Sequence, residues 1–213
     1  DRLTVVTTDF LATAGDGIFS PIIPRGGFTL SDAAPLARDV VACPGADTCN
    51  LAVTQSRGLA ADIGRALDDA GLAEVGGVRV NISGCTNSCG QHHISDIGFC
   101  GLERRAHGRS APGYQMLLGG RVGQMEIAFG EKATKVPAKA AAQAVVRVVG
   151  RFAGERSAGE TFTDWLDRSG GAKTVGEGWR DLDEFPTPED GPDFYADFDE
   201  TGPYEAGVGD SGR

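Results

Sequence analysis

Four of the five cysteines fall in two short clusters, Cys43 with Cys49 and Cys85 with Cys89. Five residues separate the first pair, three separate the second, and 35 lie between the pairs. Four thiolates gathered at one point suit a soft metal centre, either zinc or an iron–sulfur cluster. Structural zinc usually takes pairs with two to four residues between ligands, so the wider first gap favours iron–sulfur chemistry. Disulfides are not expected, because a chain of this length does not need them to fold.

The residues beside the cysteines are consistent with a shared site. Cys85 and Cys89 are four apart, so a single helical turn would point both sulfurs the same way. We expect Asp47 or Thr48 to cap a helix that begins near Cys49, which would turn backbone N–H groups toward an anionic cluster. Glycines flank the ligands, where we expect the backbone to pass close to a bulky inorganic core; they are Gly45, Gly84 and Gly90.

The sequence around these cysteines resembles the siroheme-dependent nitrite and sulfite reductases. The resemblance is carried by VACPGADTCNLA at 41–52, by NISGCTNSCGQHH at 81–93 and by IGF at 97–99. Later segments are similar as well, and the likeness runs from about residue 3 to about residue 170. These segments are YQMLLGG from Tyr114, KVPA from Lys135 and GETF from Gly159.

In that family four cysteines hold a [4Fe–4S] cluster, and the last of them also bridges to the iron of siroheme. Carried over by motif position, the resemblance implies Cys43, Cys49, Cys85 and Cys89 as ligands, with Cys89 as the bridge. Such enzymes reduce a small anion, sulfite to sulfide or nitrite to ammonia, with six electrons passed singly from a ferredoxin-like donor. NSCGQ is more similar to the nitrite enzymes and TCNLA to certain sulfite enzymes, and we expect sulfite by a narrow margin.

Two further residues are candidates for contacts with siroheme. Asn87 lies between two ligands, where its amide would bond to the macrocycle or to cluster sulfur, or would instead form a local turn. Arg121 follows two glycines, and its guanidinium suits the carboxylates of siroheme; a hairpin turn with a surface arginine is the alternative. Arg38 and Arg57 are weaker candidates of the same kind.

Three other residues near the second cysteine pair have a structural and a functional interpretation. His92 and His93 would donate hydrogen bonds or protons to a prosthetic group, or would pack beside the loop. Cys100 lies outside the paired motif, and a buried free cysteine behaves as a small hydrophobic residue, so we expect it in the core.

The pattern of apolar residues predicts an α+β, or mixed α/β, layered domain, and the resemblance implies that this domain is of the nitrite/sulfite reductase type. We expect helices over 47–70, from Pro137 and over 160–168, and strands over 78–82, 97–100, 114–118 and 125–129. The resemblance implies that residues 1–40 end a ferredoxin-like subdomain and that residues 41–170 form the cluster- and siroheme-binding domain. We expect residues 171–213 to form an extended acidic arm held by its aromatic residues.

The net charge of −10 is confined to one end of the chain. Residues 181–213 contain eleven acids and one base, whereas residues 1–180 contain nineteen of each. This balance argues against a nucleic-acid partner, because no basic surface would neutralise phosphates. No apolar run approaches a membrane span, so we expect a cytoplasmic protein.

The resemblance covers the C-terminal half of a longer polypeptide in the family. We therefore expect the missing N-terminal half as a partner, and we assign no catalytic acid to this chain. The competing interpretation is a non-catalytic electron-transfer or structural domain that holds zinc or a bare iron–sulfur cluster.

Overall fold

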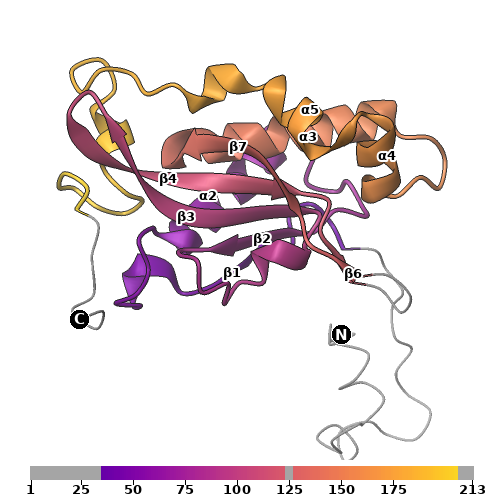
Figure 1. Cartoon of the computed structure of the whole chain (residues 1–213), viewed down its shortest axis with the longest axis horizontal. Helices are drawn as coiled ribbons and strands as arrows, with labels where there is room; N and C mark the ends of the chain where they lie inside the picture. Colours follow the sequence, from indigo (N-terminus) through magenta and orange to yellow (C-terminus); the bar gives the residue numbers. More distant parts are fainter. Residues whose placement is uncertain (1–34, 123–126, 206–213) are drawn as a thin grey trace, which may run out of the picture. The chain divides into compact units, whose positions relative to one another are not determined.

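A five-stranded mixed sheet lies at the centre of the fold (Figure 1). The structure, a computed structural model, describes residues 35–122 and 127–205. The strands stand in the order β1-β2-β3-β4-β7. β1, β2 and β3 are parallel to one another, and β3, β4 and β7 are antiparallel. Their bounds are Val41–Ala42 for β1, Val80–Ser83 for β2, Ile97–Ala106 for β3, Arg109–Leu118 for β4 and Glu131–Pro137 for β7.

Two long helices pack together behind the sheet in the view of Figure 1. α2, Ser56–Asp69, connects β1 to β2, because neighbouring parallel strands require a crossover connection. α3, Ala141–Glu155, follows β7 through the 3-10 turn η3, Ala138–Ala140. Each helix buries one apolar stripe at helical spacing. The stripes are Leu59, Ile63 and Leu67 on α2, and Val145, Val148, Val149 and Phe152 on α3.

A cluster of aromatic rings joins the end of α3 to the short helix α4, Phe162–Arg168. The ring centroids of Phe152, Phe162 and Trp165 lie 5.3 to 5.6 Å apart. α4 begins after Thr161, whose side-chain oxygen accepts a hydrogen bond from the Asp164 backbone N–H at 3.2 Å. The sequence-based prediction of a helix over 160–168 is therefore confirmed to within two residues.

The first predicted helix begins later than expected. The sequence pattern suggests 47–70, whereas α2 starts at Ser56 and ends at Asp69, just before Gly71 in the left-handed conformation. Gly45–Asp47 instead forms the 3-10 turn η1. The backbone N–H groups of Val53 and Thr54 donate to the carbonyl of Gly84, on the loop after β2. They therefore cannot form the hydrogen bonds of a helix.

The predicted strands agree with the sheet, with two omissions. The alternation at 78–82 marks β2, and the apolar runs at 97–100 and 114–118 lie inside β3 and β4. β1 and β7 were not predicted, because β1 has two residues and β7 is mostly polar. Of the strand expected at 125–129, Ile127–Ala128 is found as β6; residues 125 and 126 lie outside the described residues, as does most of the expected ferredoxin-like segment.

The C-terminal segment is not extended throughout. Gly171–Glu177 forms helix α5, which packs against β7, and Arg180–Asp183 and Pro192–Tyr195 form the 3-10 turns η4 and η5. The expectation of an extended arm from residue 171 is therefore wrong over α5, where Ala172 and Val175 supply a buried face. Aromatic residues do hold the later segment to the body, because Tyr195, Phe198 and Tyr204 are buried.

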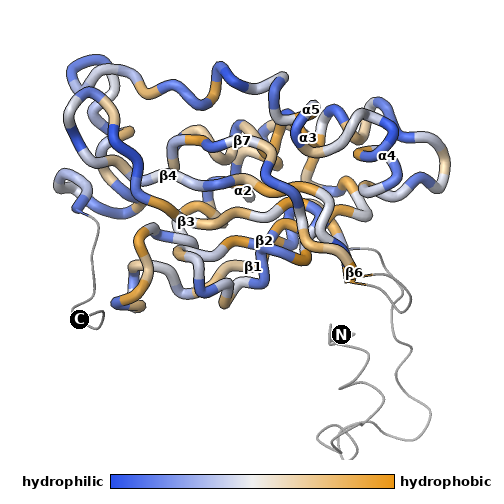
Figure 2. Tube along the Cα trace, viewed as in Figure 1, coloured by the Kyte–Doolittle hydropathy of each residue, from blue (hydrophilic) through white to orange (hydrophobic). Residues whose placement is uncertain are grey.

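Hydrophobic residues follow the central strands, and hydrophilic residues dominate the C-terminal segment along the top of the view (Figure 2). Among the residues that the structure describes, no helix is both long enough and apolar enough to span a bilayer.

The aromatic cluster should account for much of the stability of the helical layer. Phe152 is 1% exposed, so Phe152→Ala should lower the free energy of unfolding by about 3–5 kcal/mol through lost burial and a cavity. The control is Phe129→Ala, a residue that is 71% exposed, which should change it by less than about 1 kcal/mol. Urea denaturation of both variants measures the difference, and equal losses would contradict the assigned core.

Candidate metal centre

The carboxyl ends of β1 and β2 bring the two cysteine clusters together. Cys43 directly follows β1, and its N–H donates to the Ile82 carbonyl on β2 at 3.0 Å. The Gly84 N–H then donates to the Cys43 sulfur at 3.2 Å. The residue before Cys85 thus contacts the first sulfur of the other pair. Open sheets with parallel strands commonly bind ligands beyond the carboxyl ends of those strands.

Residues 53–56, which we name the junction segment, connect the two cysteine loops. The Val53 and Thr54 N–H groups donate to the Gly84 carbonyl at 2.8 and 3.2 Å. The Ser56 hydroxyl lies 3.3 Å from the Cys43 sulfur. The Thr54 carbonyl accepts from the Ala46 N–H at 2.9 Å, inside the first loop. The junction segment therefore fixes the relative position of the two loops.

Glycines make this close approach possible. A Cβ atom on Gly84 would lie 2.6 Å from the Thr54 carbonyl oxygen and 2.9 Å from the Ser56 hydroxyl. Gly45, at φ +67°, approaches Ser56 in the same way, and Gly90 approaches the Ile82 carbonyl. A side chain at any of these three glycines would therefore overlap protein atoms, which is a reason for glycine that the sequence does not reveal; their expected proximity to an inorganic core stays a prediction.

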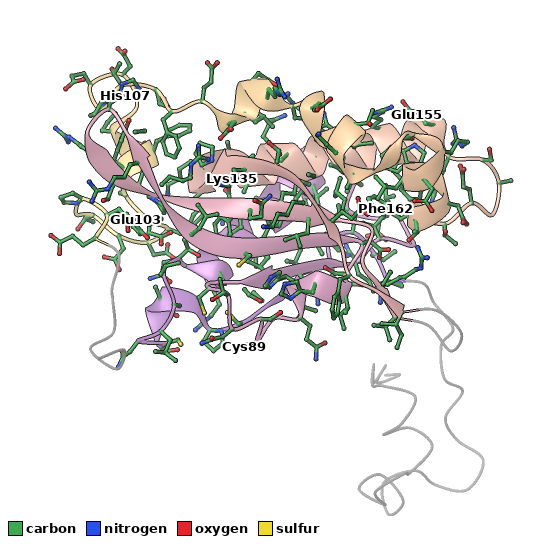
Figure 3. The ribbon with its side chains drawn as sticks, viewed as in Figure 1. Cys89, Glu103, His107, Lys135, Glu155 and Phe162 are labelled. Atoms are coloured by element: carbon green, nitrogen blue, oxygen red, sulfur yellow. The ribbon has the colours of Figure 1, made fainter. Side chains whose placement is uncertain are left out.

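The second cysteine pair lies on a turn whose return is anchored to β2. The Ser83 hydroxyl accepts from the Gly90 N–H at 3.0 Å, and the Asn81 side chain donates to the Gly90 carbonyl at 2.9 Å. Ser88 has φ +62°, which a right-handed helix excludes, so the predicted helical turn between the two ligands is wrong. Cys85 is half-buried and Cys89 exposed, and Cys89 lies beyond the β1–β2 side of the sheet (Figure 3).

In the described residues, neither Asp47 nor Thr48 caps a helix near Cys49, contrary to the sequence-based expectation. Asp47 ends η1, and its carboxylate accepts from Arg57 at 2.7 Å. The Cys49 N–H donates to the Gly45 carbonyl at 3.0 Å, so the first loop satisfies this group itself. Thr48 follows η1 and does not precede a helix; α2 begins seven residues after Cys49.

The two histidines pack against each other beside this turn. Their ring centroids lie 4.0 Å apart, and the Ser88 hydroxyl is 2.7 Å from Nδ1 of His93 and 3.4 Å from Nδ1 of His92. Burial, together with the neighbouring charge of His93, lowers the pKa of His92 to about 4. His92 is therefore neutral at pH 7, in agreement with packing beside the loop.

The other predicted residues are found around the site. Asn87 is exposed on the turn between Cys85 and Cys89. Arg121 begins β5, Arg121–Val122, which pairs with β6 in a small hairpin. The Gly130 N–H, just after β6, donates to the His93 carbonyl at 2.7 Å, so this hairpin adjoins the turn that follows Cys89. Arg38, by contrast, pairs with Glu74 at 2.6 Å.

The fifth cysteine differs chemically from the other four. Cys100 is buried on β3 beside Ser83, as expected, and burial with the nearby Cys85 thiol raises its pKa to about 11. Because the thiolate is the metal-binding form, Cys100 is a poor ligand. The remaining donors are four free, partly exposed thiols on two joined loops, a set that fits an iron–sulfur cluster. Within the described residues, no three His, Cys, Asp or Glu side chains converge tightly enough for a single metal ion.

Several residues of the site carry no signal in the sequence. Thr54 and Ser56 are buried polar residues of the junction segment, in a stretch that resembles a helix start. Asp197 accepts from the Gln55 N–H at 3.0 Å from 142 residues away, and the Tyr204 hydroxyl donates to the Val53 carbonyl at 2.7 Å. Contacts over such distances leave no local pattern by which to find them.

Gly84→Ala should separate the two cysteine loops. Its Cβ would overlap the junction segment, so we expect a loss of about 1–3 kcal/mol in unfolding free energy and faster alkylation of Cys43. Gly64→Ala is the control, because no atom lies within 4 Å of its Cβ position and alanine favours the helix by about 0.5–1 kcal/mol. Urea denaturation and thiol labelling of the metal-free chain measure both. An unchanged Gly84→Ala variant would refute the close packing.

His92 should make the stability of the metal-free chain depend on pH. Its pKa falls from 6.5 to about 4 on folding, so the unfolded chain binds the extra proton. Stability is full above pH 6.5 and declines toward pH 4, by about 2 kcal/mol between pH 7 and pH 5. His92→Gln should remove that part of the decline, whereas His107→Gln, at an exposed histidine, should keep it. Denaturation at the two pH values tests this, and equal slopes in all three proteins would contradict it.

The chain is similar to known proteins in both sequence and fold. Residues 33–177 match the family model described as the nitrite and sulphite reductase 4Fe-4S domain. A sulfite reductase [ferredoxin] of Mycobacterium tuberculosis is 36% identical over 139 residues, which cover 62% of this chain and 25% of that protein. An assimilatory ferredoxin-dependent nitrite reductase of Haloferax mediterranei is 34% identical over 139 residues, covering 64% and 24%. The chain thus spans about a quarter of the length of these relatives.

Solved structures show the same fold. The NirA protein of Mycobacterium tuberculosis superimposes with a TM-score of 0.54 at 35% identity, over 63% of this chain and 26% of that one. Dissimilatory sulfite reductase I superimposes with a TM-score of 0.51 at 10% identity, over 68% and 53%, which indicates a shared fold alone. The predicted mixed α/β fold is therefore confirmed. With more than half of its residues matched, the chain belongs to the nitrite and sulphite reductase 4Fe-4S domain family.

Proposed function

We propose that Cys43, Cys49, Cys85 and Cys89 hold a [4Fe–4S] cluster and that Cys89 also bridges to siroheme, in an enzyme that reduces sulfite or nitrite. The observation that carries this proposal is the hydrogen bond from the Gly84 N–H to the Cys43 sulfur, which joins the two cysteine loops at one edge of the sheet. When bound, the cluster and siroheme would supply the single electrons that reduce the anion.

The four thiols differ in accessibility in a way that suits these roles. Cys43, Cys49 and Cys85 are half-buried, whereas Cys89 is exposed, so a macrocycle outside the described fold can reach its sulfur. The Gly84 N–H donates to the Cys43 sulfur, so this sulfur is held in place by the loop that carries the second cysteine pair.

Residues around Cys89 supply a surface for siroheme. Asn87, exposed on the same turn, places an amide beside the bridging position. Arg121 lies on the hairpin that adjoins residues 92–95, where its guanidinium suits a siroheme carboxylate. His92, buried and neutral at pH 7, is better suited to support the turn than to deliver a proton.

The anion and the electron donor are inferred from relatives. The names of related proteins include both sulfite and nitrite reductases, and each specifies ferredoxin, so we propose a ferredoxin-like donor. We keep the narrow preference for sulfite and propose a cytoplasmic enzyme. The chain spans about a quarter of the length of those relatives. From the family resemblance, we propose that the catalytic acids and part of the siroheme pocket lie in an N-terminal half of the enzyme.

The alternative is a non-catalytic domain that binds a bare iron–sulfur cluster or zinc. Four cysteines can hold either metal centre, although the described side chains do not converge tightly enough for a single ion such as zinc. The visible spectrum of the purified complete protein separates the cases. Siroheme gives strong Soret and red bands, a bare cluster gives a broad shoulder, and zinc gives no visible band.

Cys89→Ser should abolish turnover in the complete protein, because serine is a hard donor and a poor bridge between soft irons. Cys100→Ala is the matched control, since this buried thiol lies outside the ligand set; it should keep its iron and most of its activity, at a cost of about 1 kcal/mol in stability. Steady-state assays with sulfite and with nitrite, together with iron analysis, measure both. Near-normal turnover in Cys89→Ser, or iron loss in Cys100→Ala, would show that the ligands are assigned wrongly.

A further inference from the structure

A segment near the C-terminus is hydrogen-bonded to the junction segment. We name residues 195–204 the strap. Asp197, 5% exposed, accepts from the Gln55 N–H at 3.0 Å with one carboxylate oxygen and from the Phe198 N–H at 2.8 Å with the other. The Tyr204 hydroxyl donates to the Val53 carbonyl at 2.7 Å. Asp197 and Tyr204 thus bind two polar backbone groups of the junction segment.

The strap is also packed against the helical layer. Phe198 is buried over α2 at Gly58, where any side chain would overlap its Cβ atom. The Lys139 ammonium lies 4.2 Å from the centroid of the Phe198 ring, within range of a cation–π interaction. The Tyr204 N–H donates to the Tyr195 carbonyl at 2.7 Å, which closes the strap on itself. These contacts fix the strap against the helical layer.

Asp197 takes the place of a local helix cap. Gln55 is the N-cap residue of α2 and its own side chain makes no capping bond. The buried carboxylate of Asp197 accepts from the Gln55 N–H instead, and an anion at this end is favoured by the helix dipole. A capping residue supplied from 142 residues away couples the start of α2 to the placement of the strap.

Three of the four residues of the junction segment also contact the cysteine loops. Val53 and Thr54 donate to Gly84, and Ser56 contacts the Cys43 sulfur. Movement of the junction segment away from the strap would therefore loosen both loops. The strap lies outside residues 33–177, the part that matches the family, so this support is not part of the shared domain.

We propose that the strap, through Asp197 and Tyr204, is a positioning element that holds the junction segment against the cysteine loops and slows the loss of the cluster. Its effect on the cluster rests on the proposed function, whereas its hold on the junction segment does not. Asp197 and Tyr204 are positioning residues in this account, because their contacts are to backbone and not to a ligand.

Hydrogen exchange in the metal-free full chain tests the first part. Tyr204→Phe removes only the hydroxyl that reaches Val53, and it should raise exchange of the Val53 and Thr54 amides about fivefold, the effect of one ordinary hydrogen bond. Tyr195→Phe is the control, because its hydroxyl donates to Pro186 within the C-terminal segment. Exchange in β3 and β4 should not change in either variant. Equal protection of Val53 in both variants and the wild type would overturn the proposal.

Cluster retention tests the second part. After anaerobic loading with iron and sulfide, Asp197→Ala should release iron to a chelator at least about tenfold faster than wild type, because it loses a charged hydrogen bond. Asp197→Asn retains an acceptor oxygen and should restore most of the retention, and Asp193→Asn at an exposed position should match wild type. Equal release rates in all proteins would overturn the cluster role. If the wild type took up no iron, the proposed function would fail as well, while the exchange data would still decide whether the strap holds the junction.

Discussion

The carbonyl oxygen of Gly84 is the contact on which the candidate site depends. It accepts hydrogen bonds from the Val53 and Thr54 N–H groups, and the Thr54 hydroxyl lies 3.4 Å away. These bonds tie the loop after β1 to the loop after β2, so they set where the two pairs of sulfurs stand. A side chain on Gly84, or on Gly101 of the neighbouring strand, would prevent the approach. The tight packing of backbone against backbone explains why glycines recur near the cysteines.

The antiparallel and parallel parts of the sheet have different roles. The antiparallel strands β3, β4 and β7, with α3, α4 and α5, form most of the apolar core. The parallel strands β1 and β2 are short, and their carboxyl ends carry the cysteine loops. A stable layer on one side thus supports a polar, glycine-rich edge on the other. Such an edge buries little apolar surface, so hydrogen bonds from the junction segment and the strap have to fix it.

Local features of the fold and the site could be predicted from the sequence. The paired cysteines and the flanking motifs identify the family, and helical spacing identifies the buried faces of α2 and α3. The predictions that failed involve backbone groups whose partners are distant in sequence. Residues 47–55 have helix-forming character, but Gly84 takes two of their N–H groups, and the left-handed Ser88 ends any helical turn between Cys85 and Cys89. The roles of Asp197 and Tyr204 depend on contacts more than 140 residues apart, which no local pattern encodes.

The assignment of the four ligands is also the claim on which the proposed chemistry stands. Cys100 is the natural competitor, because it lies beside Ser83 and close enough to Cys85 for that thiol to raise its pKa further. Its burial argues against it, and the partial exposure of the other four argues for them. Both arguments concern the chemistry of the thiols and not the position of the metal. Locating the iron atoms directly would decide whether Cys100 or the four partly exposed cysteines bind them.

Anomalous diffraction at the iron edge, from crystals of the anaerobically loaded chain, tests this assignment most directly. The account predicts one compact cluster of iron peaks beyond the carboxyl ends of β1 and β2, bonded to the sulfurs of Cys43, Cys49, Cys85 and Cys89. A single metal ion at that position, iron bonded to Cys100, or an iron cluster that leaves one of the four sulfurs free would contradict it.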